Sequence, residues 1–118
     1  MKIFYNEYGT PFAYTDDNEH IFTFPGKPVG YIFADKIYSY NGKHLGWYID
    51  GWIRDINGYC VFFTETATGG PIKPMRKMAP IRSVKTIKPL KRLRSLPHLK
   101  PIKRLAWSRY KDMEFFTQ

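Results

Sequence analysis

The sequence of 118 residues is poor in the features that anchor or cross-link a chain. Its only cysteine is Cys60, so no disulfide can form within the chain, and a reducing, cytoplasmic location is expected. No run of about 18 apolar residues is present, so we expect no membrane-spanning helix. The opening residues, MKIFYNEYGT, lack an apolar core, and we expect no secretory signal.

Catalytic signatures are also missing. There is no G-x-S-x-G, no phosphate-binding loop and no dinucleotide fingerprint. None of the three histidines has a cysteine or carboxylate at metal-ligand spacing. The pair Asp16 and Asp17 is typical of a turn rather than of an acid–base pair, and Cys60 alternates within an apolar strand like a small buried hydrophobe. We therefore predict no enzyme activity, catalytic residue, metal or cofactor.

Acidic residues are scarce in the second half of the chain. Residues 1–70 hold five Lys/Arg and eight Asp/Glu, a net charge of −3, whereas residues 71–118 hold fourteen and two, a net charge of +12. Their sum is the net charge of +9 for the chain. An excess of this size favours an anionic partner.

The first half contains an internal repeat, which is marked by glycines spaced 17, 16 and 16 residues apart. An isoleucine precedes each glycine, by six residues in the first unit and by five in the others. A small residue follows the first three glycines by four residues, where the fourth unit has Phe62, and an aromatic residue comes next. The repeat positions are Gly9, Gly26, Gly42 and Gly58; Ile3, Ile21, Ile37 and Ile53; and the small residues Ala13, Gly30 and Gly46.

Each unit predicts a β-hairpin. Asn41-Gly42 and Asn57-Gly58 are tight-turn dipeptides, and β-branched and aromatic residues dominate the flanking segments. One hairpin cannot bury its apolar face, whereas four around an axis can, and pairing the first strand with the last removes both open edges. We predict an all-β fold of four pseudo-symmetric hairpins closed into a ring, with small residues where backbones approach closely. The expected strands are 2–5, 11–16, 20–24, 28–33, 36–40, 44–49, 52–56 and 59–65.

The segments GTPFAY, GKPVGY and GKHLGW, followed by GGP, a Pro/Lys/Arg triplet tract and a late Trp-Ser, resemble the bacterial four-fold β-flower proteins. The resemblance covers nearly the whole chain. It implies a small β-rich domain with internal four-fold pseudosymmetry. It implies no catalytic residue, because the family carries no established activity to transfer.

From Pro71 the chain has a period of three, and the middle residue of twelve successive triplets is apolar. The third residue is Lys or Arg in nine of the twelve, and the first is Pro in five. On an α-helix, apolar residues spaced three apart would not stay on one face, and on a β-strand they would alternate between the two faces. The spacing matches polyproline II, which has three residues per turn and accepts proline, whereas proline breaks an α-helix. We predict three parts: a repeat domain (1–70), a polyproline-II-like segment (71–106) and an aromatic anchor (107–118) that includes Phe115 and Phe116.

Extended straight, the segment would span about 110 Å, so it must wrap, bend back or lie against something else. The alternative is a disordered tail. The apolar row favours docking, either on its own domain, whose acidic loop residues complement it, or on a neighbouring subunit. Those acidic residues are Asp16, Asp17, Asp35, Asp50 and Glu65. The expected docking residues are Ile81, Val84, Ile87, Leu90, Leu93, Leu96, Leu99, Ile102, Leu105 and Trp107.

Two functions fit this pattern. In the first, the chain is a non-enzymatic module whose basic row binds a polyanion such as nucleic acid. In the second, the segment is a structural strap that holds its own subunit or a neighbour in a homo-oligomer. We expect no membrane partner, because an apolar row on polyproline II is narrow and the aromatic residues lie off it. The residues expected to contact a polyanion are Lys73, Arg76, Arg82, Lys85, Lys88, Lys91, Arg94, Lys100 and Lys103.

Overall fold

The computed structural model describes residues 1–118, and it contains all eight predicted strands. Each observed strand begins within one residue and ends within two residues of its expected bounds. The strands are β1 (Lys2–Tyr5), β2 (Pro11–Thr15), β3 (His20–Thr23), β4 (Pro28–Phe33), β5 (Lys36–Tyr38), β6 (His44–Ile49), β7 (Trp52–Asp55) and β8 (Cys60–Phe63).

The strands form one closed antiparallel barrel in which each strand pairs with the next. The ring closes where β1 meets β8, through the partners Tyr5 and Phe63. This confirms the predicted all-β ring of four hairpins. Closure pairs both outer strands, so neither is left as an open edge.

A polar residue stabilises each of the four hairpin turns, and it always lies three residues before the repeat glycine. The Asn6 and Asp55 side-chain oxygens each accept two backbone N–H groups of their own turn. The hydroxyls of Thr23 and Ser39 accept the N–H of Lys27 and of Lys43. These side chains satisfy turn amides that the short strands leave free.

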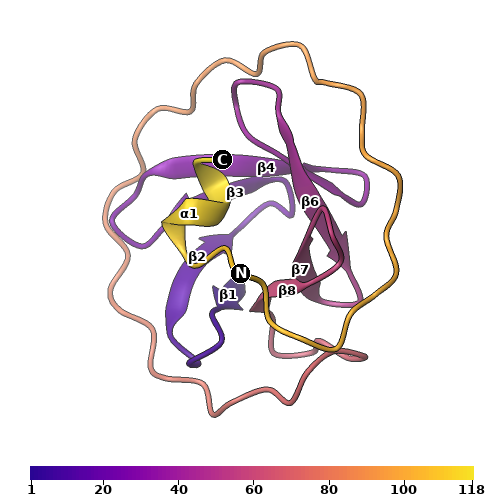
Figure 1. Cartoon of the computed structure of the whole chain (residues 1–118). Helices are drawn as coiled ribbons and strands as arrows, with labels where there is room; N and C mark the ends of the chain where they lie inside the picture. The colour runs from indigo at the N-terminus through magenta and orange to yellow at the C-terminus, as the bar shows by residue number, and fades with distance from the viewer.

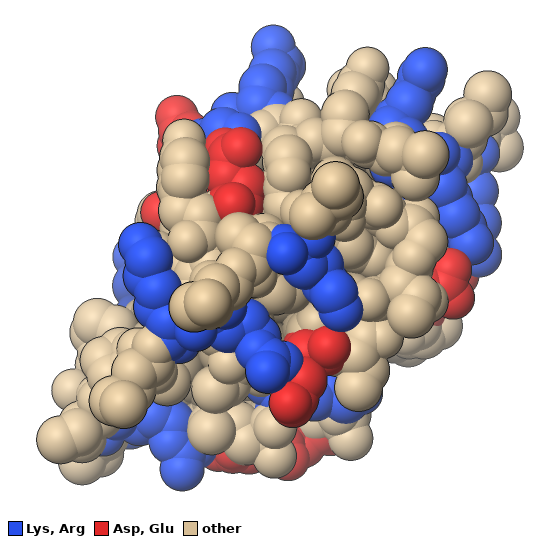
Figure 2. Space-filling model, turned by 90° about the horizontal axis from the view of Figure 1, so that it is seen from below, with Lys and Arg blue, Asp and Glu red and all other residues tan.

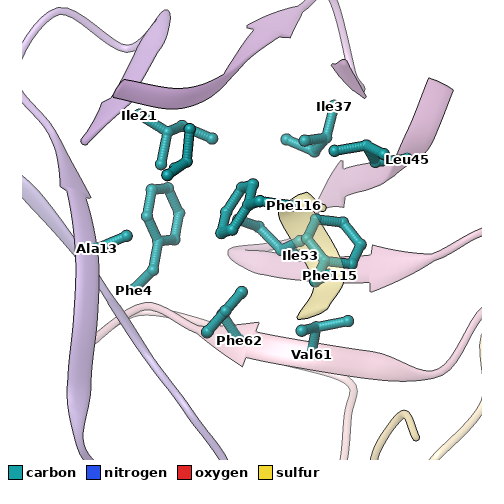
Figure 3. Packing of buried hydrophobic residues seen from close by; sticks show 11 residues of the cluster. Phe4, Ala13, Ile21, Ile37, Leu45, Ile53, Val61, Phe62, Phe115 and Phe116 are labelled. Atoms are coloured by element: carbon teal, nitrogen blue, oxygen red, sulfur yellow. The ribbon is translucent and has the colours of Figure 1, made fainter. Parts of the chain in front are cut away.

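The barrel interior is filled by apolar side chains from all four units (Figure 3). Ile21, Ile37 and Ile53 are fully buried there, as the repeat predicts. The prediction for Ile3 is wrong: Phe4, which has the regular spacing of five residues before Gly9, takes the equivalent core position. Ile3 is partly buried against a separate cluster, since neighbouring residues of a strand point to opposite faces.

The end of the chain closes this core. The short helix α1 (Met113–Phe116) lies across the barrel in Figure 1 and places Phe115 and Phe116 among the core residues. Phe116 stacks on Phe12 and Phe62, at ring-centroid distances of 6.3 and 5.8 Å. The predicted aromatic anchor is therefore an integral part of the core.

Residues 71–106, called the strap below, encircle the barrel as one extended loop (Figure 1). The molecule measures 36 × 35 × 22 Å, a flattened disc. Thirty-six residues in polyproline II span about 110 Å, close to the circumference of a disc about 35 Å wide. The strap is therefore long enough for one turn around its own barrel.

The small repeat residues lie where backbones approach closely, as predicted. A Cβ atom placed on Gly46 would lie 2.0 Å from the carbonyl oxygen of Arg54 on the neighbouring strand. A Cβ on Gly30 would lie 2.8 Å from the carbonyl oxygen of Tyr38. Phe62 fills the corresponding place in the fourth unit and is fully buried.

Because the obstructing atom at Gly46 belongs to a paired backbone, it cannot move aside without breaking the ladder. We expect Gly46→Ala to lower the free energy of unfolding by about 2–4 kcal/mol. Gly30→Ala is the matched control, with more space, and its loss should be smaller. Urea unfolding of both variants measures the difference, and equal losses would contradict the account.

Candidate functional site

The strap docks on the barrel at the four repeat glycines. A Cβ on any of them would lie only 2.0–2.2 Å from a strap carbonyl oxygen. The carbonyls belong to Met75 over Gly9, Val84 over Gly26, Leu93 over Gly42 and Ile102 over Gly58. All four glycines also have φ between +79° and +101°. Glycine is thus required twice over, by the turn and by the strap above it.

Backbone hydrogen bonds hold the strap in the same register. Its N–H groups donate to the carbonyls of the four glycines at 2.7–3.1 Å, from Lys77, Thr86, Ser95 and Arg104. Two further N–H groups, of Ser83 and Arg92, donate to Phe24 and Tyr40. The equivalent strap positions in the other two quarters are Pro74 and Pro101, which have no N–H to donate.

The contacts therefore recur every nine strap residues, or three triplets, for each barrel unit of 16 or 17 residues. Three triplets end without a cation, and Lys88 occupies the same phase of this period in the second quarter. Those triplets end at Ala79, Pro97 and Ala106, which are separated by 18 and 9 residues and so share one phase of the nine-residue period. Ala79 packs beside the Tyr14 cluster, where a charged side chain would be desolvated.

Strap cations lie over the repeated aromatic residues of the barrel. Arg82 and Lys85 lie over Tyr14, Lys91 over Tyr31 and Lys100 over Trp47, with 4.5–5.7 Å from cation to ring centroid. These rings are only 1–3% exposed. The outer face of the barrel is therefore an aromatic layer covered by cations, an arrangement that cation–π attraction stabilises.

The same cations pair with acidic loop residues. Asp16 accepts Arg82 and Lys85, Asp35 accepts Lys100, Asp50 accepts Lys103, and Glu65 accepts Arg76. The predicted docking of the basic segment on these acidic residues is thus observed at four of the five. Asp17 instead binds His20, and the unpredicted Glu19 takes Lys91. Hydrogen bonds from Lys85, Lys91 and Lys100 hold the pKa values of Asp16, Glu19 and Asp35 below their usual range.

Buried polar side chains fix the end of the strap. Arg54, only 2% exposed, donates through Nη1 to the carbonyls of Gly58 and Arg104, each at 2.7 Å. The Ser108 hydroxyl donates to the buried Asp55 carboxylate. Trp107 packs against Trp52 and Phe63, as its predicted docking role implies. The sequence pattern gave no indication of the role of Arg54.

A second contact between the strap and a buried polar side chain involves two histidines, His44 and His98. The backbone N–H of His98 on the strap donates to Nδ1 of buried His44 at 3.0 Å, which places the proton of the neutral ring on Nε2. The His44 ring also contacts Trp47 edge-on, at a centroid distance of 4.7 Å. Burial lowers the pKa of His44, because the charged form of the ring loses its hydration inside the protein.

The predicted docking of the strap's apolar row is wrong. Its twelve aliphatic side chains, called the rim below, are 71–96% exposed, and the strap is held instead by its backbone and its cations. The period of three separates one edge of the strap from another, but it does not say which edge faces the barrel. The rim is Ile72, Met75, Met78, Ile81, Val84, Ile87, Leu90, Leu93, Leu96, Leu99, Ile102 and Leu105.

The nine cations expected to bind a polyanion have mixed surroundings. Six pair with the carboxylates described above. Lys73 donates to the carbonyls of Glu65 and Ala67, Arg94 stacks over Phe33 at 3.7 Å, and Lys88 is exposed without a partner. Figure 2 shows Lys and Arg scattered among uncharged side chains, with Asp and Glu beside several of them.

Other groups offer little chemistry. No group of three or more His, Cys, Asp or Glu side chains is placed to hold a metal ion. Cys60 is fully buried, and burial raises the pKa of its thiol to about 11, so it is not a ready nucleophile. None of the helices has the length and apolar character needed to cross a bilayer.

Fold and strap together define a class: a closed barrel of four pseudo-equivalent hairpins, bound by an encircling extended segment. The family model described as 4-fold beta flower protein matches residues 2–116, and the chain belongs to that family. The resemblance inferred from the sequence is thereby confirmed. Neither the curated proteins nor the solved structures provide a significant match.

Two contributions to the effect of replacing a turn glycine, the loss of strap docking and the strain of the turn, can be measured separately. Gly42 has φ +94° with a strap carbonyl above it, whereas Gly69 has φ +78° with nothing within 4 Å of an added Cβ. Both Gly→Ala variants incur the left-handed backbone strain, about 1–2 kcal/mol. Gly42→Ala should lose about 1–3 kcal/mol more on unfolding in urea, because it also displaces the strap. Equal losses would contradict docking at this glycine.

The burial of His44 predicts that the stability of the fold depends on pH. The pKa of His44 is lowered in the folded protein from its ordinary 6.5, so the unfolded chain binds the proton more readily. Stability is therefore fully present above about pH 6.5 and falls as the pH drops below it. Unfolding in urea between about pH 7.5 and pH 5.5 measures this loss before the carboxylates titrate.

Two variants test whether His44 causes this dependence of stability on pH. His44→Phe should be less stable at neutral pH, but it should lose the part of the pH dependence of stability that His44 causes. His98→Gln retains the backbone N–H that bonds His44, so its stability should depend on pH as in the native chain. An unchanged slope in His44→Phe would show that the acid sensitivity arises elsewhere.

Proposed function

We propose that this protein is a non-enzymatic interaction module that binds an anionic, apolar partner through the rim. The observation that carries the proposal is the exposure of all twelve rim side chains on a segment that is itself fixed to the barrel. Exposed apolar surface beyond a few scattered residues marks interaction sites, and here twelve large apolar side chains follow one another along a fixed segment.

The strap also supplies positive charge beside the rim. Twelve Lys and Arg side chains lie within residues 71–106, and six of them have no carboxylate partner. The six are Lys73, Lys77, Lys88, Arg92, Arg94 and Arg104. A partner that is both apolar and anionic satisfies both kinds of side chain. The backbone hydrogen bonds that hold the strap reduce the ordering entropy lost on binding.

Nucleic-acid binding is the second candidate, and the net charge of +9 favours it. Three observations weigh against it. Six of the predicted cations already neutralise barrel carboxylates, and the barrel aromatics that could stack on bases are covered by the strap. A row of exposed aliphatic side chains also has no role against phosphates. A cytoplasmic location and the absence of enzyme activity remain parts of this proposal.

The exposure of the rim is tested by combining Leu90→Ser, Leu93→Ser and Leu96→Ser. Because these side chains are at least 91% exposed, the triple change should alter the free energy of unfolding by less than about 0.5 kcal/mol. A clearly larger loss would mean that the apolar row packs on the protein.

Binding is tested with two probes and a variant in which all twelve rim residues are Ser. An anionic naphthalene sulfonate dye, which is both apolar and charged, should bind the native chain and lose most of its binding in the variant. Duplex and single-stranded DNA are titrated across a salt series as the second probe. DNA binding that survives the twelve substitutions, without rim-dependent dye binding, would favour the second candidate. Binding of neither probe would overturn both.

A further inference from the structure

We propose that the partner of the rim is the surface of an anionic lipid bilayer. This rests on the proposed function and names the partner class. It reverses the expectation from sequence that no membrane is involved, which rested on the narrowness of the apolar row and on the position of the aromatic residues away from it. The rim is apolar as a result of folding, because the three-residue period turns isolated aliphatic side chains to one edge of the strap.

The composition of the strap favours lipid over protein. Its 36 residues contain no Phe, Tyr or Trp, and its cations are seven Lys and five Arg. Protein–protein hot spots are enriched in Trp, Tyr and Arg, whereas Lys is depleted at such interfaces. Aliphatic side chains that enter the acyl region, flanked by Lys and Arg at the headgroups, are the pattern of interfacial membrane binding.

The charge and shape of the rim support the same occupant. A second copy of the chain would bring together two molecules of charge +9, which opposes close contact between their straps. Successive rim side chains are about 9 Å apart along a convex edge, so a rigid flat partner would contact only a few of them. A fluid bilayer can rise around a convex edge, and anionic headgroups attract each nearby cation.

The strap presents four equivalent faces to such a surface. Each quarter of nine residues (71–79, 80–88, 89–97 and 98–106) carries three rim side chains and three cations. Each spans about 28 Å, a stretch that one shallow contact with a flat bilayer can engage. The disc therefore binds in any of four rotational positions, and no single quarter is essential.

The test is cosedimentation of the full chain with unilamellar vesicles. Vesicles of equimolar phosphatidylcholine and phosphatidylglycerol should bind at least about tenfold more tightly than vesicles of phosphatidylcholine alone, through several cations near the surface. The twelve-Ser variant should lose at least about tenfold in affinity. The triple variant of residues 90, 93 and 96 should lose less than about twofold, since three of four equal faces remain.

Charge is tested separately by replacing the six cations without carboxylate partners by Gln, which leaves the strap's ion pairs to the barrel intact. Binding to anionic vesicles should weaken and lose much of its salt dependence. Circular dichroism and the urea midpoint confirm that each variant is folded.

Three outcomes would overturn the lipid proposal. One is no vesicle binding at low salt, and another is equal binding of the native and twelve-Ser chains. The third is self-association through the rim, seen as a solution mass that rises with salt in the native chain only. If the dye binds through the rim while vesicles do not, the lipid proposal fails and the proposed function stands, with an acidic, apolar protein surface as the partner.

Discussion

The structure depends on one repeated contact, a strap carbonyl lying over a turn glycine while a strap N–H donates to that glycine's carbonyl. The contact occurs four times, at intervals of nine strap residues. It bonds backbone groups of a segment that makes no regular ladder, groups that would otherwise depend on water. Because backbone atoms make the contact, the rim side chains do not pack on the barrel and are available for a partner.

The barrel and the strap meet the need for burial in different ways. Inside, the four units and the C-terminal phenylalanines form one apolar core. Outside, the repeated aromatic rings are covered by strap cations, which are in turn held by loop carboxylates. The net positive charge of the second half thus has a structural role in part. What remains after these ion pairs, together with the rim, is the surface that we assign to an anionic partner.

Much of the fold follows from the sequence, because turn chemistry and repeat spacing act locally. The glycine spacing predicts the hairpins, and the edge argument predicts that β1 pairs with β8. The polar residue three positions before each glycine, such as Asp55, is equally visible in the sequence and could have been found. The sequence does not show that the rim faces solvent, because apolar residues are usually buried and the backbone hydrogen bonds that hold the strap leave no side-chain pattern. Arg54 and His44 act at single places without a repeat, so no periodicity marks them.

The central claim is that the strap is a fixed ring in register with the turns, and amide hydrogen exchange tests it directly. The N–H groups of Lys77, Thr86, Ser95 and Arg104 should exchange slowly, since each is bonded to a turn glycine. Those of Arg76, Lys85, Arg94 and Lys103 have no such bond and should exchange fast, so that protection recurs every nine residues. Uniformly fast exchange across residues 71–106 would contradict the account.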